Sequence, residues 1–197
     1  YEFNPRTGDA RNSGTLASLA GLEKASKNHD HYQLELSIKR ISLINALFIM
    51  KKGIPMIYSG DELAQLNDYS YKEEIDKRND SRWLHRPKMR WHLLDEIIHP
   101  LSPVSQVYNR IRQLIKQRKE LGEIGLIETE RILYQGNSHL LVLEQTVKDS
   151  CVRILLCFNL SEDRQWLHAS DLRRYGVAGE YSELLQGKGI SFDEEKI

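Results

Sequence analysis

Hydrophobic residues recur at helical spacing in three segments of the chain, which predicts helices over 15–27, 32–52 and 103–121. Ser13, Asp30 and Ser102 stand where N-cap residues are expected, and Pro103 takes a first helical position. The second segment is apolar around most of its circumference, so we expect neighbours on more than one side of it. Its main predicted buried face comprises Leu34, Ile38, Ile41, Asn45 and Phe48.

A short unbroken apolar run, residues 54–58, follows the second predicted helix after the stop signal Lys51-Lys52-Gly53. Such a run is typical of a strand buried on both faces, as in a parallel sheet. Residues 63–101 then show no periodic pattern and are rich in charged and aromatic side chains. A long loop after a buried strand is usually functional, because ligands bind at that end of α/β sheets.

The last third of the chain alternates as antiparallel strands do, with strands predicted over 131–134, 138–145, 152–159 and 165–168. The turn signals Gly136-Asn137 and Lys148-Asp149 separate the first three. One face of the third strand is predicted to be its core face: Val152, Ile154, Leu156 and Phe158. The pattern predicts a small antiparallel β-sandwich over 123–197, after an α/β segment over 1–122.

Composition narrows the possible functions. The 197 residues carry 28 Lys and Arg against 28 Asp and Glu, and this zero net charge argues against a nucleic-acid partner. No apolar run has the length of a membrane span. Cys151 and Cys157 are the two cysteines; one predicted strand would hold them too far apart for a disulfide, and their spacing does not suit zinc.

The chain begins at Tyr1 in what reads as the middle of a loop, and it ends without a terminating turn. We therefore expect it to be part of a longer protein. No signal peptide is visible, and a cytoplasmic location is expected.

Three motifs, in order, resemble the α-amylase superfamily of glycoside hydrolases and transglycosidases. Gly53–Glu62, read GIPMIYSGDE, resembles its eighth barrel strand. Asn4–Thr15 resembles the end of the extra loop domain of amylosucrases, and Leu66-Asn67-Asp68 with Asn79–Pro87 resembles the loop after their eighth strand. The resemblance to the C-terminal third of an amylosucrase covers essentially the whole chain.

This resemblance implies the last helices and eighth strand of a (β/α)8 TIM barrel, followed by a β-sandwich domain whose last strand is missing here. It implies retaining glucosyl transfer from sucrose to an α-glucan or to water, without an organic cofactor or a metal. The catalytic Asp, Glu and second Asp would lie upstream of this chain, so no catalytic residue is expected within it. The isolated chain is expected to self-associate, because the strand at 54–58 would lack its barrel neighbours.

The resemblance also implies substrate-binding residues. Arg82, in the sequence Asp80-Ser-Arg-Trp83, is expected to help form the glucose pocket and to pair with an Asp from an early barrel loop. A planar bidentate donor suits both a carboxylate and vicinal sugar hydroxyls. Asp80 and Trp83 are included from the same motif, and Arg11 resembles an arginine on the acceptor side.

Two acidic motifs are interpreted as structural. Asn28-His29-Asp30 resembles a catalytic pair of the superfamily, but the residues before it are helical and polar, so a turn with Asp30 as N-cap is favoured. Asp61 and Glu62 are adjacent, and neighbours on an extended chain point to opposite sides. They are expected to shape the mouth of the barrel rather than to flank one sugar as a retaining pair must.

Two alternatives to an amylosucrase-type enzyme stay open. One is a related sucrose or α-glucoside hydrolase, which differs in its acceptor. The other is a non-catalytic carbohydrate-binding or assembly module.

Overall fold

The computed structural model describes residues 2–4, 6–124, 126–133, 136–183 and 189–191. They divide into two compact units. The first comprises residues 1–48 and 56–114, and the second comprises residues 49–55 and 115–197. Two long helices, α3 (His31–Met50) and α4 (Pro103–Ile124), each continue from the first unit into the second.

Short elements precede α3 in the first unit. Strands β1 (Glu2–Asn4) and β2 (Asp9–Arg11) form an antiparallel hairpin. The predicted helix over 15–27 is interrupted, giving α1 (Leu16–Leu19) and α2 (Leu22–Lys27). Gly21 between them has φ 102°, a left-handed conformation that breaks the helix and that glycine adopts without strain. Thr15, not the predicted Ser13, caps α1, because its side chain accepts from the Ser18 N–H.

Helix α3 begins as the sequence predicts. The Asp30 side chain accepts the Gln33 N–H at 3.0 Å, so Asp30 is the N-cap and the turn interpretation of residues 28–30 is confirmed. Ile38, Ile41 and Asn45 are buried, whereas Phe48 on the predicted face is exposed. The first helical residues of α4 follow Ser102, whose hydroxyl accepts the Ser105 N–H at 3.3 Å.

The predicted strand at residues 54–58 is wrong for this chain. These residues are in neither strand nor helix, and Ile54 and Met56 are 94% and 87% exposed. Nothing among the described residues pairs with the backbone of residues 54–57. A strand needs a neighbouring strand to pair with its N–H and C=O groups. The apolar run at residues 54–58 does not show whether such a neighbour is present.

Because residues 54–58 are exposed, we still expect the isolated chain to self-associate. A contiguous apolar segment with unpaired backbone groups favours pairing with a second copy. We expect concentration-dependent dimers or larger species in sedimentation velocity. A monomer at all concentrations, with slow amide exchange at residues 54–57, would contradict this.

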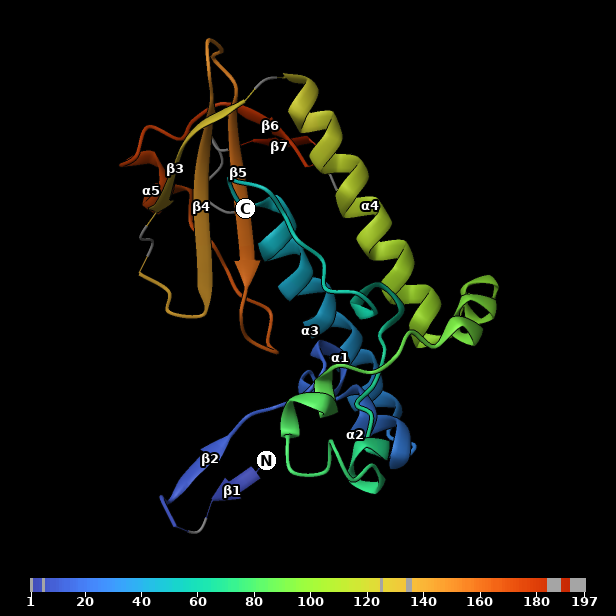
Figure 1. The fold of residues 1–197 in the computed structure, drawn as a ribbon. Helices are drawn as coiled ribbons and strands as arrows, with labels where there is room; N and C mark the ends of the chain where they lie inside the picture. Colours follow the sequence, from blue (N-terminus) through green and yellow to red (C-terminus); the bar gives the residue numbers. More distant parts are fainter. Residues whose placement is uncertain (1, 5, 125, 134–135, 184–188, 192–197) are drawn as a thin grey trace. The chain divides into compact units, whose positions relative to one another are not determined.

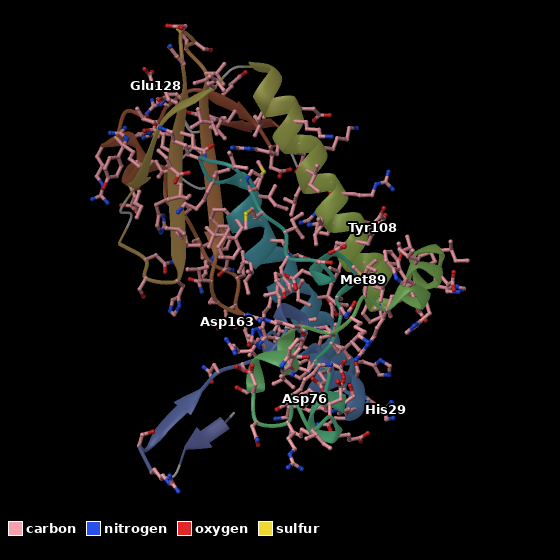
Figure 2. All side chains as sticks on the ribbon, viewed as in Figure 1. His29, Asp76, Met89, Tyr108, Glu128 and Asp163 are labelled. Atoms are coloured by element: carbon pink, nitrogen blue, oxygen red, sulfur yellow. The ribbon has the colours of Figure 1, made fainter. Side chains whose placement is uncertain are left out.

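The long loop after this segment has no α-helix or strand, as predicted, but it contains four short 3-10 helices: η1 (Asp61–Leu63), η2 (Ser70–Glu73), η3 (Ser81–His85) and η4 (Trp91–Ile98). Figure 2 shows Asp76 and Met89 on this loop. Leu63, Tyr71 and Leu84 bury their side chains, so the loop is packed rather than open.

The second unit contains a three-stranded antiparallel sheet in the order β3 (Ile127–Leu133), β4 (Leu140–Val147) and β5 (Arg153–Asn159), seen side by side in Figure 1. The predicted turns are confirmed around Gly136 and Asp149, both of which have positive φ. The predicted strand end at Tyr134 lies outside the described residues. The predicted strand at 165–168 is wrong: this segment is irregular and leads into α5 (Ala169–Arg173).

Both faces of the sheet bury side chains. Ile154, Leu156 and Phe158 are buried on the predicted core face, but Val152 is exposed. On the opposite face a second cluster forms around five buried residues, with Leu155 of β5 packed against it: Leu133, Val142, Ala169, Leu172 and Val177. In the described part of the structure, α5 and the residues that follow it therefore cover this face of the sheet. A two-stranded ribbon, β6 (Glu180–Ser182) with β7 (Gly189–Ser191), completes the unit.

Candidate functional site

The predicted residues Asp80, Arg82 and Trp83 lie together at η3. The Asp80 carboxylate accepts the Arg82 N–H at 3.0 Å, which caps the short helix. The Arg82 guanidinium donates to the same carboxylate, from Nε at 2.8 Å to Oδ1 and from Nη2 at 2.7 Å to Oδ2. Hydrogen bonding from Arg82 lowers the pKa of Asp80 to about 2, so Asp80 is ionised at neutral pH.

Arg82 remains accessible although it is paired, because its side chain is 66% exposed. Trp83 next to it is also exposed, and the Lys77 ammonium lies 4.9 Å from the centroid of its ring. Lys77 is itself paired with Glu74. The surface therefore offers a planar donor, Arg82, and an aromatic ring, Trp83, and the cations Arg82 and Lys77 are each paired with a carboxylate.

Within this chain Arg82 pairs with Asp80, two residues earlier. The pairing with an Asp from an early barrel loop, which the resemblance implies, involves a residue outside this chain and stays a prediction. Because Asp80 and Arg82 are only two residues apart, little chain entropy is lost when the turn at η3 places the carboxylate beside the guanidinium.

The predicted acceptor-side role of Arg11 stays a prediction. Arg11 is the last residue of β2, and its side chain lies outside the described part of the structure.

Asp61 and Glu62 have different environments in η1. Glu62 turns back, and its Oε2 accepts the Gly60 N–H at 2.8 Å. Burial, followed by the nearby charge of Glu62, raises the pKa of Asp61 to about 6, although a backbone hydrogen bond from Leu16 opposes the shift. The charged form of Asp61 is thus disfavoured by the fold.

Asp61→Asn should stabilise the chain at pH 8. Because the folded pKa of Asp61 is raised, its contribution to stability is full below pH 4 and is lost as pH rises through about 6. Asparagine keeps an acceptor for the Leu16 N–H without the charge. After allowance for solvent screening at this half-buried site, we expect a gain of about 1–2 kcal/mol at pH 8 and little change at pH 4 in urea unfolding.

Asp68→Asn serves as the control for that experiment. Hydrogen bonds from Ser70 lower the pKa of Asp68, so loss of its charge should destabilise the chain above pH 4. An Asp61→Asn variant that is less stable than the parent at pH 8 would contradict the burial argument.

Sequence reasoning missed a second polar group, built from Ser18, Glu23, Asn67 and Tyr69. The spacing of Glu23 and Lys27 at i and i+4 could have revealed their ion pair, which spans 2.6 Å. Nothing in the sequence could have shown that Asn67 and Tyr69 join this pair.

No family model matches this chain. Within the described ranges, no group of three or more His, Cys, Asp and Glu side chains is arranged to hold a metal ion, and both cysteines are free. No helix described by the structure is both long and apolar enough to cross a membrane.

Proposed function

We propose that this chain is the C-terminal part of an amylosucrase-type enzyme that transfers glucose from sucrose with retention. In this proposal the first unit contributes the last elements of a (β/α)8 barrel, and the sheet of the second unit belongs to a β-sandwich. The order of the three sequence motifs supports the proposal. The observation that carries it is the accessible Arg82 guanidinium, which Asp80 orients and which is followed in the sequence by the exposed Trp83.

This arrangement suits a neutral polyhydroxy ligand. A guanidinium fixed in its plane can donate two parallel hydrogen bonds to vicinal hydroxyls. An aromatic face supplies an apolar surface for stacking. The pairing of Arg82 with Asp80 and of Lys77 with Glu74 reduces the attraction of these two cations for an anion. Sugars fit these requirements better than phosphates do.

The chain by itself should not turn over sucrose. The nucleophile, the acid/base and the third carboxylate of the proposed mechanism lie upstream, and a retaining reaction requires two carboxyls flanking the bond. We expect no release of glucose or fructose from the purified chain. We expect release from the longer protein encoded by a reading frame continuous with Tyr1. Turnover by the chain alone, or an upstream frame without barrel strands, would overturn the proposal.

A non-catalytic carbohydrate-binding module is the second candidate. It is favoured by one observation: the paired Asp80 and Arg82, and Trp83 next to them in the sequence, all belong to this chain. Binding of an α-glucan to the isolated chain, lost in Arg82→Ala, together with inactivity of the longer protein on sucrose, would select this alternative.

A further inference from the structure

Residues 65–69 lie near the start of the long loop and contact its later part. The buried Gln65 side chain donates to the Lys88 carbonyl at 2.8 Å and accepts the Arg90 N–H at 3.2 Å. Arg90 returns a bond from Nη2 to the Asn67 carbonyl at 3.2 Å. The Asp68 N–H donates at 2.9 Å to the carbonyl of Leu84, a residue of η3. Residues 65–69 thus hold the returning half of the loop, including the turn that carries Arg82.

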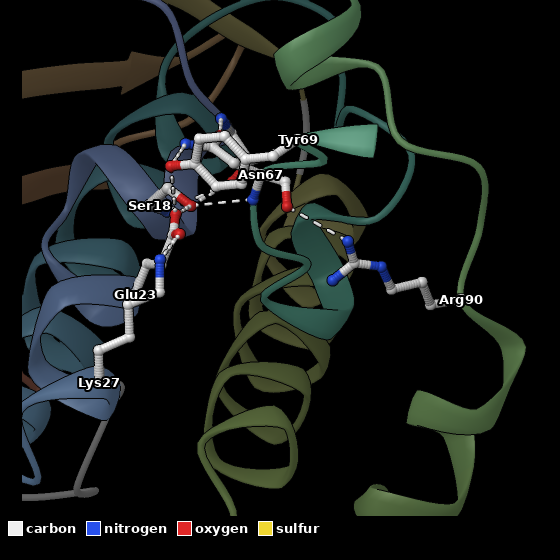
Figure 3. A network of polar contacts seen from close by, with 7 residues as sticks. Ser18, Glu23, Lys27, Asn67, Tyr69 and Arg90 are labelled. Atoms are coloured by element: carbon white, nitrogen blue, oxygen red, sulfur yellow. Dashed lines mark hydrogen bonds and ion pairs between the residues drawn. The ribbon is translucent and has the colours of Figure 1, made fainter. Parts of the chain in front are cut away.

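Two of these residues, Asn67 and Tyr69, also bond to α1, its N-cap and α2 (Figure 3). The Asn67 N–H donates to Ser18 Oγ at 3.0 Å, and Asn67 Oδ1 accepts the Thr15 N–H at 2.8 Å. Ser18 Oγ donates to Glu23 Oε2 at 2.8 Å, and the Tyr69 hydroxyl donates to the same oxygen at 3.3 Å. Two separate paths from the loop therefore end on one carboxylate.

Glu23 differs from an ordinary helix-surface glutamate. Its side chain is 11% exposed, and Lys27 Nζ donates to its other oxygen at 2.6 Å. Burial by itself would raise the pKa of Glu23, but hydrogen bonds from Lys27 and Ser18 outweigh it and lower the pKa. These hydrogen bonds therefore stabilise the ionised form of Glu23. The pair Glu35–Lys39 has the same i, i+4 spacing and the same 2.6 Å distance, but the Glu35 side chain is 65% exposed.

We propose that Glu23 is a positioning residue for the ligand-binding turn at Asp80–Trp83. Its carboxylate fixes Ser18 and Tyr69, these fix residues 67–69, and the bond from Asp68 to Leu84 fixes the turn. The nature of the ligand rests on the proposed function, whereas the mechanical link rests on the contacts alone. Lys27 reinforces the link, because its ammonium also lies 5.3 Å from the centroid of the Tyr69 ring.

Hydrogen exchange of the whole chain tests the mechanical link. Glu23→Gln should raise amide exchange across residues 66–90 by about tenfold, since bonds to a charged acceptor are replaced by bonds to a neutral one. Exchange in β4 should not change. Glu35→Gln, which breaks the matched exposed pair, should leave residues 66–90 as in the parent.

Two outcomes would overturn the link: unchanged exchange at residues 66–90 in Glu23→Gln, or an equal rise in β4 that marks a general loss of stability. If Glu23→Gln does not fold, Tyr69→Phe removes only one of the donors to Glu23. That variant should give a smaller rise confined to the same residues, and no rise would overturn the proposal.

Sucrose kinetics of the longer protein separate this link from the proposed function. Glu23→Gln should raise KM for sucrose more than it lowers kcat, because Arg82 is displaced but present, and Glu35→Gln should do neither. Faster exchange at residues 66–90 with parental kinetics would leave the link standing and overturn the role of the turn in binding sucrose. Altered kinetics without faster exchange would overturn the link.

Discussion

In the longer enzyme, Arg82→Ala is expected to lower kcat/KM for sucrose by tens- to several-hundredfold without unfolding the protein. Arg82 is the accessible half of a bidentate ion pair, and its loss leaves Asp80 as an uncompensated anion beside the proposed sugar site. Loss of a charge-assisted donor that binds the sugar in the transition state would account for a fall of that order in the rate. Steady-state kinetics with circular dichroism would measure both effects.

Two further variants sharpen that experiment. Arg82→Lys keeps the positive charge but loses the planar pair of donors, so it should recover only part of the activity. Arg78→Ala removes another exposed arginine of the same loop, and it should behave as the parent does. Near-parental activity of Arg82→Ala, or equal losses in Arg82→Ala and Arg78→Ala, would refute the assigned role.

The features that sequence predicts well in this chain depend on neighbours within a few residues. Asp30 caps α3, Ser102 precedes α4, and Lys148-Asp149 turns the chain between two strands. Each follows from local chemistry: a short side chain that accepts an N–H, or a residue that tolerates positive φ. The pairing of Asp80 with Arg82 is equally local, but it was missed because a partner from elsewhere in the protein was expected.

The features that sequence does not predict depend on distant segments. The apolar run at 54–58 has the composition of a strand but finds no partner in this chain. Leu155 lies opposite the predicted core face, yet it packs against the cluster that includes α5, because residues 165–168 are irregular and lead into that helix instead of adding a strand. Glu23 on α2 is linked to Asn67 on the long loop through Ser18. The hydrophobic pattern of one of these segments gives no information about its contacts with the other.

The largest stability effect is expected at Glu144 on β4. Its side chain is 2% exposed, and it accepts from Arg131 Nε at 2.5 Å and from Arg153 Nε at 2.7 Å. The two arginines also donate to the Tyr175 carbonyl, at 3.3 Å and 3.1 Å, which ties the chain after α5 to the sheet. The Glu144 carboxylate therefore orients Arg131 and Arg153, the two side chains that bond the segment after α5 to the sheet.

Glu144→Gln should lower the free energy of unfolding by about 2–3 kcal/mol. Removal of one member of a buried ion pair typically costs 3–5 kcal/mol, and the lower figure allows for Arg131 and Arg153, which are partly exposed and can regain water. Urea unfolding followed by circular dichroism would measure the loss. In the same variant, amide hydrogen exchange should increase more at residues 169–177 than in β4. Glu128→Gln, an exposed position on β3, should change stability by less than about 0.5 kcal/mol.

A triple variant distinguishes loss of charge balance from loss of packing. If the cost arises from two arginines left without their carboxylate, then replacing Glu144, Arg131 and Arg153 together by leucine should recover most of the stability, because no charge is left uncompensated. If the cost arises from the tie to Tyr175, the triple variant should be less stable than Glu144→Gln, since both donors to that carbonyl are then absent. Equal stability of Glu144→Gln and the parent would show that neither effect operates.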